Sequence, residues 1–261
     1  MLNITKKGKA MKTFCTLLLI LTCFFTAPLV SIYAAQDTTS KPVAIFYSPH
    51  QDDELLSMGN GIIRYIDEGY EVHVVLLTRG GGSNAIHSVN EKLESAKLSS
   101  LSKANFTRAR NREFSQSLIS MGVPRENIHF SRLRDGQTTT TEVNEVVLKY
   151  KSRFPNAEHK ALSYHDDHID HRNSGLALQT LYNSGMISSP KFYIQNVEHH
   201  LWDGKYESFD PSYQQFIDDA TLAYHTWSPR LRYYSVGGIS VVPDFQQLKA
   251  DPRSKYHYIG E

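Results

Sequence analysis

Two kinds of apolar segment alternate along most of this chain. Short runs in which nearly every residue is apolar are typical of strands buried on both faces. Longer segments in which apolar residues recur every three or four positions are typical of helices with one buried face. The short runs predict strands over residues 43–47, 71–78, 127–133, 160–164 and 191–196. The longer segments predict helices over residues 55–66, 107–121, 142–154 and 172–185.

The alternation of strands with helices indicates the fold class. A helix that connects two strands makes those strands parallel, and successive helices cover both faces of the sheet. We therefore expect an α/β fold, a Rossmann-like three-layer sandwich with a mostly parallel sheet. A single domain over residues 36–261 is long enough to bury such a core. The segment after Trp227 is rich in Tyr, Pro and Gly and indicates only a short pair of strands near a functional site.

The first 35 residues have a different pattern, which predicts a secretory signal peptide. Lysines within residues 6–12 form a basic start, and the apolar segment 14–25 that follows is too short for a membrane span. Ala34 and Ala35 then provide the small residues of a cleavage site. The alternative is an uncleaved anchor helix that continues to Val30. We expect cleavage, a secreted or extracytoplasmic protein, and no stable membrane span in the mature chain.

Composition excludes several classes of function for the mature chain. Both cysteines, Cys15 and Cys23, lie in the predicted signal peptide. After cleavage we therefore expect no disulfide, no cysteine nucleophile and no thiolate metal site. The 226 residues from position 36 onward carry 24 basic and 27 acidic side chains. Because nucleic acids are bound by strongly basic surfaces, this balance argues against a nucleic-acid partner. The oligomeric state stays open.

Candidate chemistry begins at the end of the first predicted strand, in residues 48–54 (SPHQDDE). His50 and Asp53 are three residues apart, so both side chains can reach one metal ion. Asp52 stays free to take a proton from metal-bound water. The cluster lies between a strand and a helix, and the carboxyl end of a strand is the usual place for a ligand in an open α/β sheet.

A second cluster, residues 165–173 (HDDHIDHRN), follows the fourth predicted strand. It contains His168 and His171, whose spacing can place both on one side of a turn. A hydrolytic zinc site has three protein ligands and one open position for water. His50, Asp53 and one histidine of this cluster would complete such a site. Zinc lowers the pKa of its water to about 7, and cobalt or iron could share these ligands.

Each cluster by itself has a structural alternative, because aspartate is common in solvated turns and at the starts of helices. The two clusters together favour a metal site. Both are predicted at the carboxyl ends of parallel strands, and buried carboxylates gathered there would repel each other unless a cation neutralised them.

The same motifs resemble those of the PIG-L family, also called LmbE-like, of zinc-dependent N-deacetylases. That family has a His-Pro-Asp-Asp-Glu run after its first strand and a His-Pro-Asp-His run further on. The corresponding segments here are residues 50–54 and 168–171, and residues 110–113 (RNRE) are similar to the family's Arg-x-x-Glu helix. Gln51 and Ile169 replace the two prolines of the family, each of which stiffens its turn.

The resemblance implies a role for each matching residue. The implied zinc ligands are His50, Asp53 and His171. Asp52 matches the general base, and His168 matches the residue that stabilises the oxyanion or donates a proton. Asp170 matches the acid that orients His168, and Arg110 matches an arginine near the substrate.

These implications define an expected function. The chain would be a secreted Zn²⁺-dependent N-deacetylase that hydrolyses the acetamide of an N-acetylglucosamine-type sugar or glycoconjugate to amine and acetate. Two alternatives stay open, a catalytically inactive carbohydrate-binding protein and a metal amidase with a non-sugar substrate. The presence of both Asp52 and His168 argues against the inactive protein, because binding requires neither a base nor an oxyanion partner.

Overall fold

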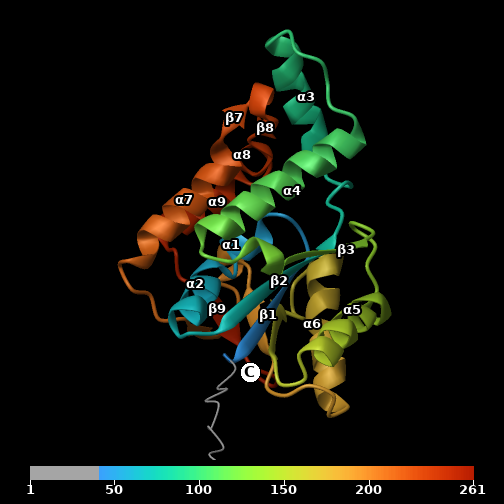
Figure 1. The fold of residues 1–261 in the computed structure, drawn as a ribbon, viewed down its shortest axis with the longest axis vertical. Helices are drawn as coiled ribbons and strands as arrows, with labels where there is room; N and C mark the ends of the chain where they lie inside the picture. Colours follow the sequence, from blue (N-terminus) through green and yellow to red (C-terminus); the bar gives the residue numbers. More distant parts are fainter. Residues whose placement is uncertain (1–40) are drawn as a thin grey trace, which may run out of the picture. The chain divides into compact units, whose positions relative to one another are not determined.

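A mostly parallel β-sheet forms the centre of the protein. In the computed structural model, which describes residues 41–261, seven strands form this sheet in the order β3-β2-β1-β4-β5-β9-β6 (Figure 1). Strands β1 to β5 are parallel to their neighbours, and β9 and β6 add antiparallel pairings at one edge. The strands are β1 (Val43–Ser48), β2 (Glu71–Thr78), β3 (Ile128–Leu133), β4 (Glu158–Leu162), β5 (Lys191–Ile194), β6 (Lys205–Tyr206) and β9 (Lys255–His257). The predicted signal peptide lies outside the described residues.

Helices cover both faces of this sheet. They are α1 (Asp53–Leu56), α2 (Gly59–Asp67), α3 (Ala85–Ser95), α4 (Lys103–Ser120), α5 (Thr140–Arg153), α6 (Ile169–Asn183), α7 (Tyr213–His225), α8 (Val236–Ser240) and α9 (Val242–Ala250). Short 3-10 helices are η1 (Arg125–Asn127), η2 (Asn196–Glu198) and η3 (Pro229–Leu231). Among the described residues, no helix combines the length and the apolar character needed to cross a bilayer.

The alternation of side chains along each central strand creates two apolar cores. Ala44 and Phe46 of β1 face a core that is completed by α1, α2, α4, α7 and α9. Ile45 and Tyr47 face the other core, which is completed by α5 and α6. Figure 1 shows these two groups of helices on opposite sides of the sheet. The expected α/β class and the mostly parallel sheet are therefore confirmed.

One expected helix is in fact two. The segment over residues 55–66 forms α1 and α2, which are separated at Ser57 and Met58. Leu55, Met58 and Ile62 are all buried, so the hydrophobic pattern continues across the break and could not indicate it.

The segment after Trp227 contains more structure than expected. The short strand pair exists, as β7 (Trp227–Ser228) and β8 (Tyr233–Tyr234), but its aromatic residues pack against α3 and α4. The part of this segment that reaches the functional cavity is instead α8 and α9, through Ser240 and Asp244. Strand β9 pairs with β5, and a strand of three residues is too short for its periodicity to be recognised in a sequence.

Candidate metal centre and active site

The first cluster begins where β1 ends. The hydroxyl of Ser48 donates a hydrogen bond to the carbonyl of His50 at 2.7 Å, and the His50 N–H donates to Asp53 Oδ2 at 2.8 Å. Asp52 has a φ of 114°, a backbone conformation that residues other than glycine rarely adopt. Such strain persists only where the surrounding structure imposes it, and it is concentrated at functional sites.

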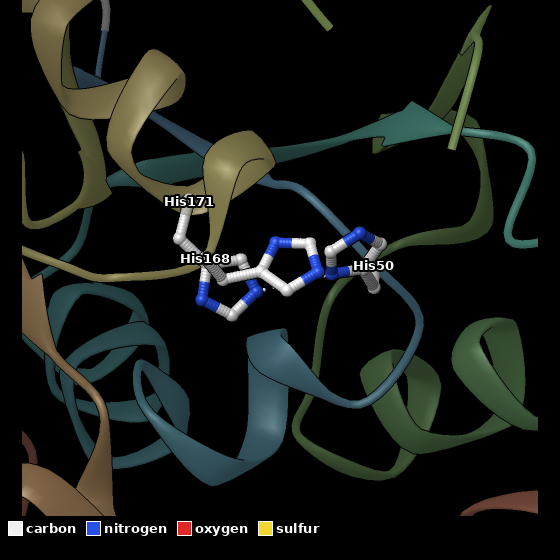
Figure 2. A group of neighbouring side chains, drawn as sticks. All are labelled: His50, His168 and His171. Carbon is white, nitrogen blue, oxygen red and sulfur yellow. Dashed lines mark hydrogen bonds between the residues drawn. The ribbon is translucent and has the colours of Figure 1, made fainter. Parts of the chain in front are cut away.

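The second cluster lies at the carboxyl end of β4, where α6 begins. His168 is the N-cap of α6, and its Nδ1 accepts a hydrogen bond from the Asp170 N–H at 3.3 Å. His171 lies in the first turn of α6 and is buried. Because β1 and β4 are neighbours in the sheet, the two clusters meet. Figure 2 shows the imidazoles of His50, His168 and His171 gathered in one place, with ring centroids 4.6–5.0 Å apart.

Three potential ligand atoms converge on one point. His50 Nδ1 and His171 Nε2 are 3.0 Å apart, and Asp53 Oδ2 lies 3.4 Å from the first and 3.3 Å from the second. Tetrahedral zinc with ligands at 2.0–2.2 Å separates those ligands by about 3.3–3.6 Å. The two distances to Asp53 match this separation and the distance between the imidazole nitrogens is slightly shorter, so a single ion can be reached by all three atoms. His50, His168 and His171 each also offer a ring nitrogen that lies within 4.8 Å of the other two.

The outer nitrogens of two of these imidazoles face carboxylates. His50 Nε2 is 2.9 Å from Asp170 Oδ2, and His171 Nδ1 is 3.0 Å from Asp166 Oδ2. Metal-ligating histidines characteristically donate their second N–H to a carboxylate in this way. With the protons on the outer nitrogens, the inner nitrogens present two lone pairs to each other at 3.0 Å. A cation between them would remove that repulsion, so the donor set fits a metal ion.

The electrostatic environment favours positive charge at this point. Burial acts to lower the pKa of His171, but the charge of Asp53 and hydrogen bonds to Asp166 and Asp53 outweigh it and raise the pKa to about 9. Burial also opposes the charged form of His50, yet hydrogen bonds to Asp135, Asp170 and Asp53 raise its pKa well above the usual value. The carboxylates that stabilise these protonated rings would equally stabilise a bound cation.

The carboxylate of Asp170 does not have the contact that the resemblance implied. It faces His50 rather than His168, and it also accepts hydrogen bonds from the Gly136 N–H at 2.6 Å, the Thr138 N–H at 3.0 Å and the Thr138 hydroxyl at 2.8 Å. Both oxygens of this carboxylate are therefore engaged by His50 and by the loop after β3. Burial acts to raise its pKa, but the hydrogen bonds from His50 and from this loop lower it, which suits a carboxylate that orients a cationic centre.

Asp52 lies beside the three converging atoms and contacts an arginine of α4. Arg110 donates to the carbonyls of Gly80 and Gln51 at 2.9 Å each, and its Nη2 is 3.4 Å from Asp52 Oδ2. Burial raises the pKa of Asp52, the charge of Arg110 lowers it, and the result is a pKa of about 7. A carboxylate with that pKa can both accept and release a proton near neutral pH.

A buried glutamate stabilises the strained backbone at Asp52. Glu54 accepts a hydrogen bond from the Asp52 N–H at 2.9 Å and another from the hydroxyl of Tyr224 at 2.5 Å. Tyr224 belongs to α7 and is itself buried. Glu54 thus supports the loop, and Tyr224 is a supporting residue that sequence reasoning missed, because nothing local in its segment indicates a partner 170 residues away.

A cavity of about 660 Å³ contains the site. Its walls include His50, Asp52, Asp53, His168, His171 and Arg110, which are predicted site residues, together with the loop over residues 82–85 and part of α8 and α9. Sequence reasoning missed Asp135, which follows the third predicted strand and is 3.4 Å from His50. The position of Asp135 after a predicted strand could have indicated its place in the site, because acidic residues at the carboxyl ends of neighbouring parallel strands converge. Asp166 belongs to the second cluster but was given no role in the sequence analysis, and only the folded chain places it against His171.

Comparison with protein families gives one clear match. The model of the PIG-L family, described as GlcNAc-PI de-N-acetylase, matches residues 45–182, which is slightly more than half of the chain and includes both clusters. No curated protein matches the chain.

Several solved structures have a similar fold. The zinc-inhibited form of a teicoplanin deacetylase is 13% identical, with a TM-score of 0.58, over 84% of this chain and 99% of that one. The N,N'-diacetylchitobiose deacetylase from Pyrococcus horikoshii is 16% identical, with a TM-score of 0.56, over 84% of each chain. The 4-carboxy-2-hydroxymuconate hydratase from Pseudomonas putida is 14% identical, with a TM-score of 0.56, over 84% of this chain and 97% of that one. At such identities the similarity shows the fold alone.

Proposed function

The chain belongs to the PIG-L family of GlcNAc-PI de-N-acetylases, and from this premise we propose that it is a secreted zinc-dependent N-deacetylase. The proposed reaction hydrolyses the acetamide of an N-acetylglucosamine-type sugar or glycoconjugate to a free amine and acetate. The description of the family and the activity named for the Pyrococcus horikoshii relative support this substrate class. Support for secretion comes from the predicted signal peptide over residues 1–35.

We assign His50, Asp53 and His171 as the protein ligands. The Asp53 oxygen is at ligand-to-ligand distance from both imidazole nitrogens, whereas Nδ1 of His168 already accepts the Asp170 N–H. Zinc held there would polarise the acetamide carbonyl and increase the acidity of a water molecule.

The side chains around the ligands supply the proton transfers. Asp52 accepts a proton from the attacking water as the new C–O bond forms. The charge of Arg110, whose Nη2 is 3.4 Å from Asp52 Oδ2, favours the ionised form of Asp52. Because Nδ1 of His168 is an acceptor, the proton of its neutral ring is on Nε2, which can donate to the oxyanion that develops. When the C–N bond breaks, Asp52 returns its proton to the leaving amine, and no covalent enzyme intermediate forms.

One observation carries this proposal, namely the convergence of His50 Nδ1, His171 Nε2 and Asp53 Oδ2 beside an aspartate that is not among the assigned ligands. The experiment is to purify the chain without added metal, measure its zinc, cobalt and iron, and assay acetate release from N,N'-diacetylchitobiose. Addition of a chelator should abolish the release, and zinc up to one equivalent should restore it. Metal-independent release, or a protein that holds no metal and releases no acetate, would contradict the proposal.

The hydratase among the similar structures points to one alternative reaction. The same residues could activate a water molecule for attack on a substrate other than an amide, such as a polarised double bond. Acetate release separates the two candidates, because hydration releases no acetate and consumes the double bond instead.

A further inference from the structure

A second cavity, of about 640 Å³, adjoins the catalytic cavity and differs from it in charge. The two cavities share Gly82 and Asp135 in their walls. The catalytic cavity contains several carboxylates, whereas the second cavity is lined by four cationic side chains. These are Arg79, Lys103, Arg132 and Arg134. We call this second space the basic cavity.

All four of these side chains are exposed. Within residues 41–261, none of them forms an ion pair. Two are held by neutral groups, because Arg79 Nε donates to the carbonyl of Arg132 at 3.1 Å and Arg134 Nη1 donates to Gln137 Oε1 at 2.9 Å. Four positive charges therefore line this cavity against one carboxylate, that of Asp135, and such a concentration of positive charge attracts anions.

The acid that borders both cavities pairs with His50 and not with any of these four cations. Asp135 Oδ1 is 3.4 Å from His50 Nε2, and Asp135 Oδ2 accepts the Gly82 N–H at 2.7 Å. Both of its oxygens are thus engaged by the catalytic cluster and by the loop. Asp135 separates an acidic cavity from a basic one.

The backbone around the basic cavity is irregular. Arg132 has a φ of 69°, and the pairing of β2 with β3 shifts register between Leu76 and Thr78. An irregularity of this kind near the end of a strand changes the direction in which side chains point and is common beside active sites. At Gly81, a Cβ atom would lie 3.1 Å from Cε of Lys103 and 3.0 Å from the hydroxyl of Thr107. The absence of a side chain there leaves the lysine in place and the cavity open.

We propose that the basic cavity is an anion subsite, so that the substrate carries a phosphate or carboxylate group close to the acetamido group that is hydrolysed. This inference rests on the proposed deacetylase function. The carboxylates of the catalytic cavity repel an anionic group, and the four cations attract it. A substrate with both groups would consequently bind in one orientation, with its anion in the basic cavity and its acetamide beside Asp52.

The test compares three probes that share one acetamido sugar. The neutral probe is N-acetylglucosamine, the phosphorylated probe is N-acetylglucosamine 1-phosphate, and the carboxylated probe is N-acetylmuramic acid. We expect kcat/KM to be at least tenfold higher for an anionic probe than for the neutral one. Added salt should reduce this difference, because exposed charges are screened. A preference for only one of the anionic probes would support the subsite and identify its anion.

Removal of two of the charges should weaken this preference. Each exposed ion pair contributes a factor of about two to five, so the double variant R132Q/R134Q should lose about tenfold in kcat/KM for the preferred anionic probe. Its loss for the neutral probe should be at least five times smaller. The matched control is R125Q/K149Q, which removes two exposed cations outside both cavities. Equal rates for all probes in the wild type, or equal losses for all probes in R132Q/R134Q, would overturn the proposal.

Binding measurements separate this inference from the proposed function. If the wild type releases acetate from no probe, the deacetylase proposal fails as tested. Calorimetry with N-acetylglucosamine 1-phosphate, N-acetylmuramic acid and N-acetylglucosamine then decides on the subsite alone. Binding of an anionic probe that is lost in R132Q/R134Q supports an anion subsite. Failure of the wild type to bind the anionic probes more tightly than N-acetylglucosamine rules the subsite out.

Discussion

Charged side chains gather at both ends of the parallel strands, and the two groups are balanced in different ways. At the start of β4 and β5, a lysine–glutamate cluster contains Lys160, Lys191, Arg64, Glu158 and Glu207. Lys160 and Lys191 are each 2.6 Å from a carboxylate, of Glu158 and Glu207 respectively, and Arg64 pairs with Glu207 as well. Arg64 also pairs with Glu68, so the three cations face three carboxylates of the chain itself.

The carboxyl ends of the strands present the opposite case. Five aspartates gather there around two imidazoles and one arginine. These aspartates are Asp52, Asp53, Asp135, Asp166 and Asp170, and the arginine is Arg110. The side chains alone leave an excess of negative charge among groups that are mostly buried. A buried cluster that is balanced by the chain stabilises the fold, whereas one that lacks positive charge is suited to binding a cation.

The largest effect on activity should follow from removal of a metal ligand at the carboxyl ends of the strands. His171→Ala removes one of two facing imidazoles, so we expect loss of the metal and no measurable acetate release. Elemental analysis and an acetate assay on the same preparation measure both. His165→Ala, an exposed histidine of the same cluster, is the control and should keep its metal. A fully loaded His171→Ala protein would remove this residue from the ligand set.

Asp52→Asn should separate metal binding from catalysis. The amide occupies the same space but accepts no proton, so turnover should fall by about 10²–10⁴ while the metal content stays unchanged, which is the usual effect of losing a general acid–base group. Turnover at the wild-type rate would show that another group takes the proton.

Glu207→Gln tests the balanced cluster. It leaves Lys191 and Arg64 without their shared carboxylate, and removal of one partner of a buried pair costs about 3–5 kcal/mol in the free energy of unfolding. Urea denaturation measures the loss. Lys205→Gln, which disrupts the exposed pair with Glu261, is the control and should cost less than about 1 kcal/mol. If Glu207→Gln lost its metal but kept its stability, the lysine–glutamate cluster would not have the stabilising role that we assign to it.

A smaller effect is expected from the carboxylate behind His171. Asp166→Asn keeps a hydrogen-bond acceptor but loses the charge, and changes of this kind weaken metal affinity by about 10–100-fold. Competition with a chelator measures the affinity. Asp167→Asn changes the neighbouring exposed acid and serves as the control. Equal affinities in the two variants would show that Asp166 does not tune the site.

The smallest effect concerns the pH dependence of turnover. Asp52 must be ionised to accept a proton, and burial raises its pKa to about 7, so activity should fall as the pH drops through this region. A bound cation lowers that pKa, which places the acidic limb at or below pH 7. Because the charge of Arg110 also lowers the pKa, Arg110→Gln should move the limb to higher pH. Arg112→Gln is the control on the same helix, and identical profiles for both would refute the coupling.

Much of the fold followed from short-range pattern. The strands predicted over residues 43–47 and 71–78 are β1 and β2 with almost the same bounds, because strands covered on both faces need continuous apolar runs. The same pattern failed at the break between α1 and α2, where buried residues continue on both sides. Helices α3, α7, α8 and α9 were not predicted. Without α7, the sequence analysis could not identify Tyr224, which supports Glu54.

The candidate site was predictable to the extent that it is local. His50 and Asp53 lie within one turn, and His171 follows its strand in the same way, so spacing together with the family resemblance was enough to bring them into one hypothesis. The contact of Asp170 with His50 instead of His168 was not predictable, because it depends on hydrogen bonds from Gly136 and Thr138 in a loop between other elements.

The sequence by itself determined the layered α/β class and the residues that meet at the carboxyl ends of the strands, because periodicity and chain direction are local properties. Only the tertiary structure decided which carboxylate supports which imidazole, what holds the strained turn at Asp52, and where the basic cavity lies. Those features depend on side chains from separate elements that approach within hydrogen-bonding distance, and such approaches are set by the packing of the whole chain.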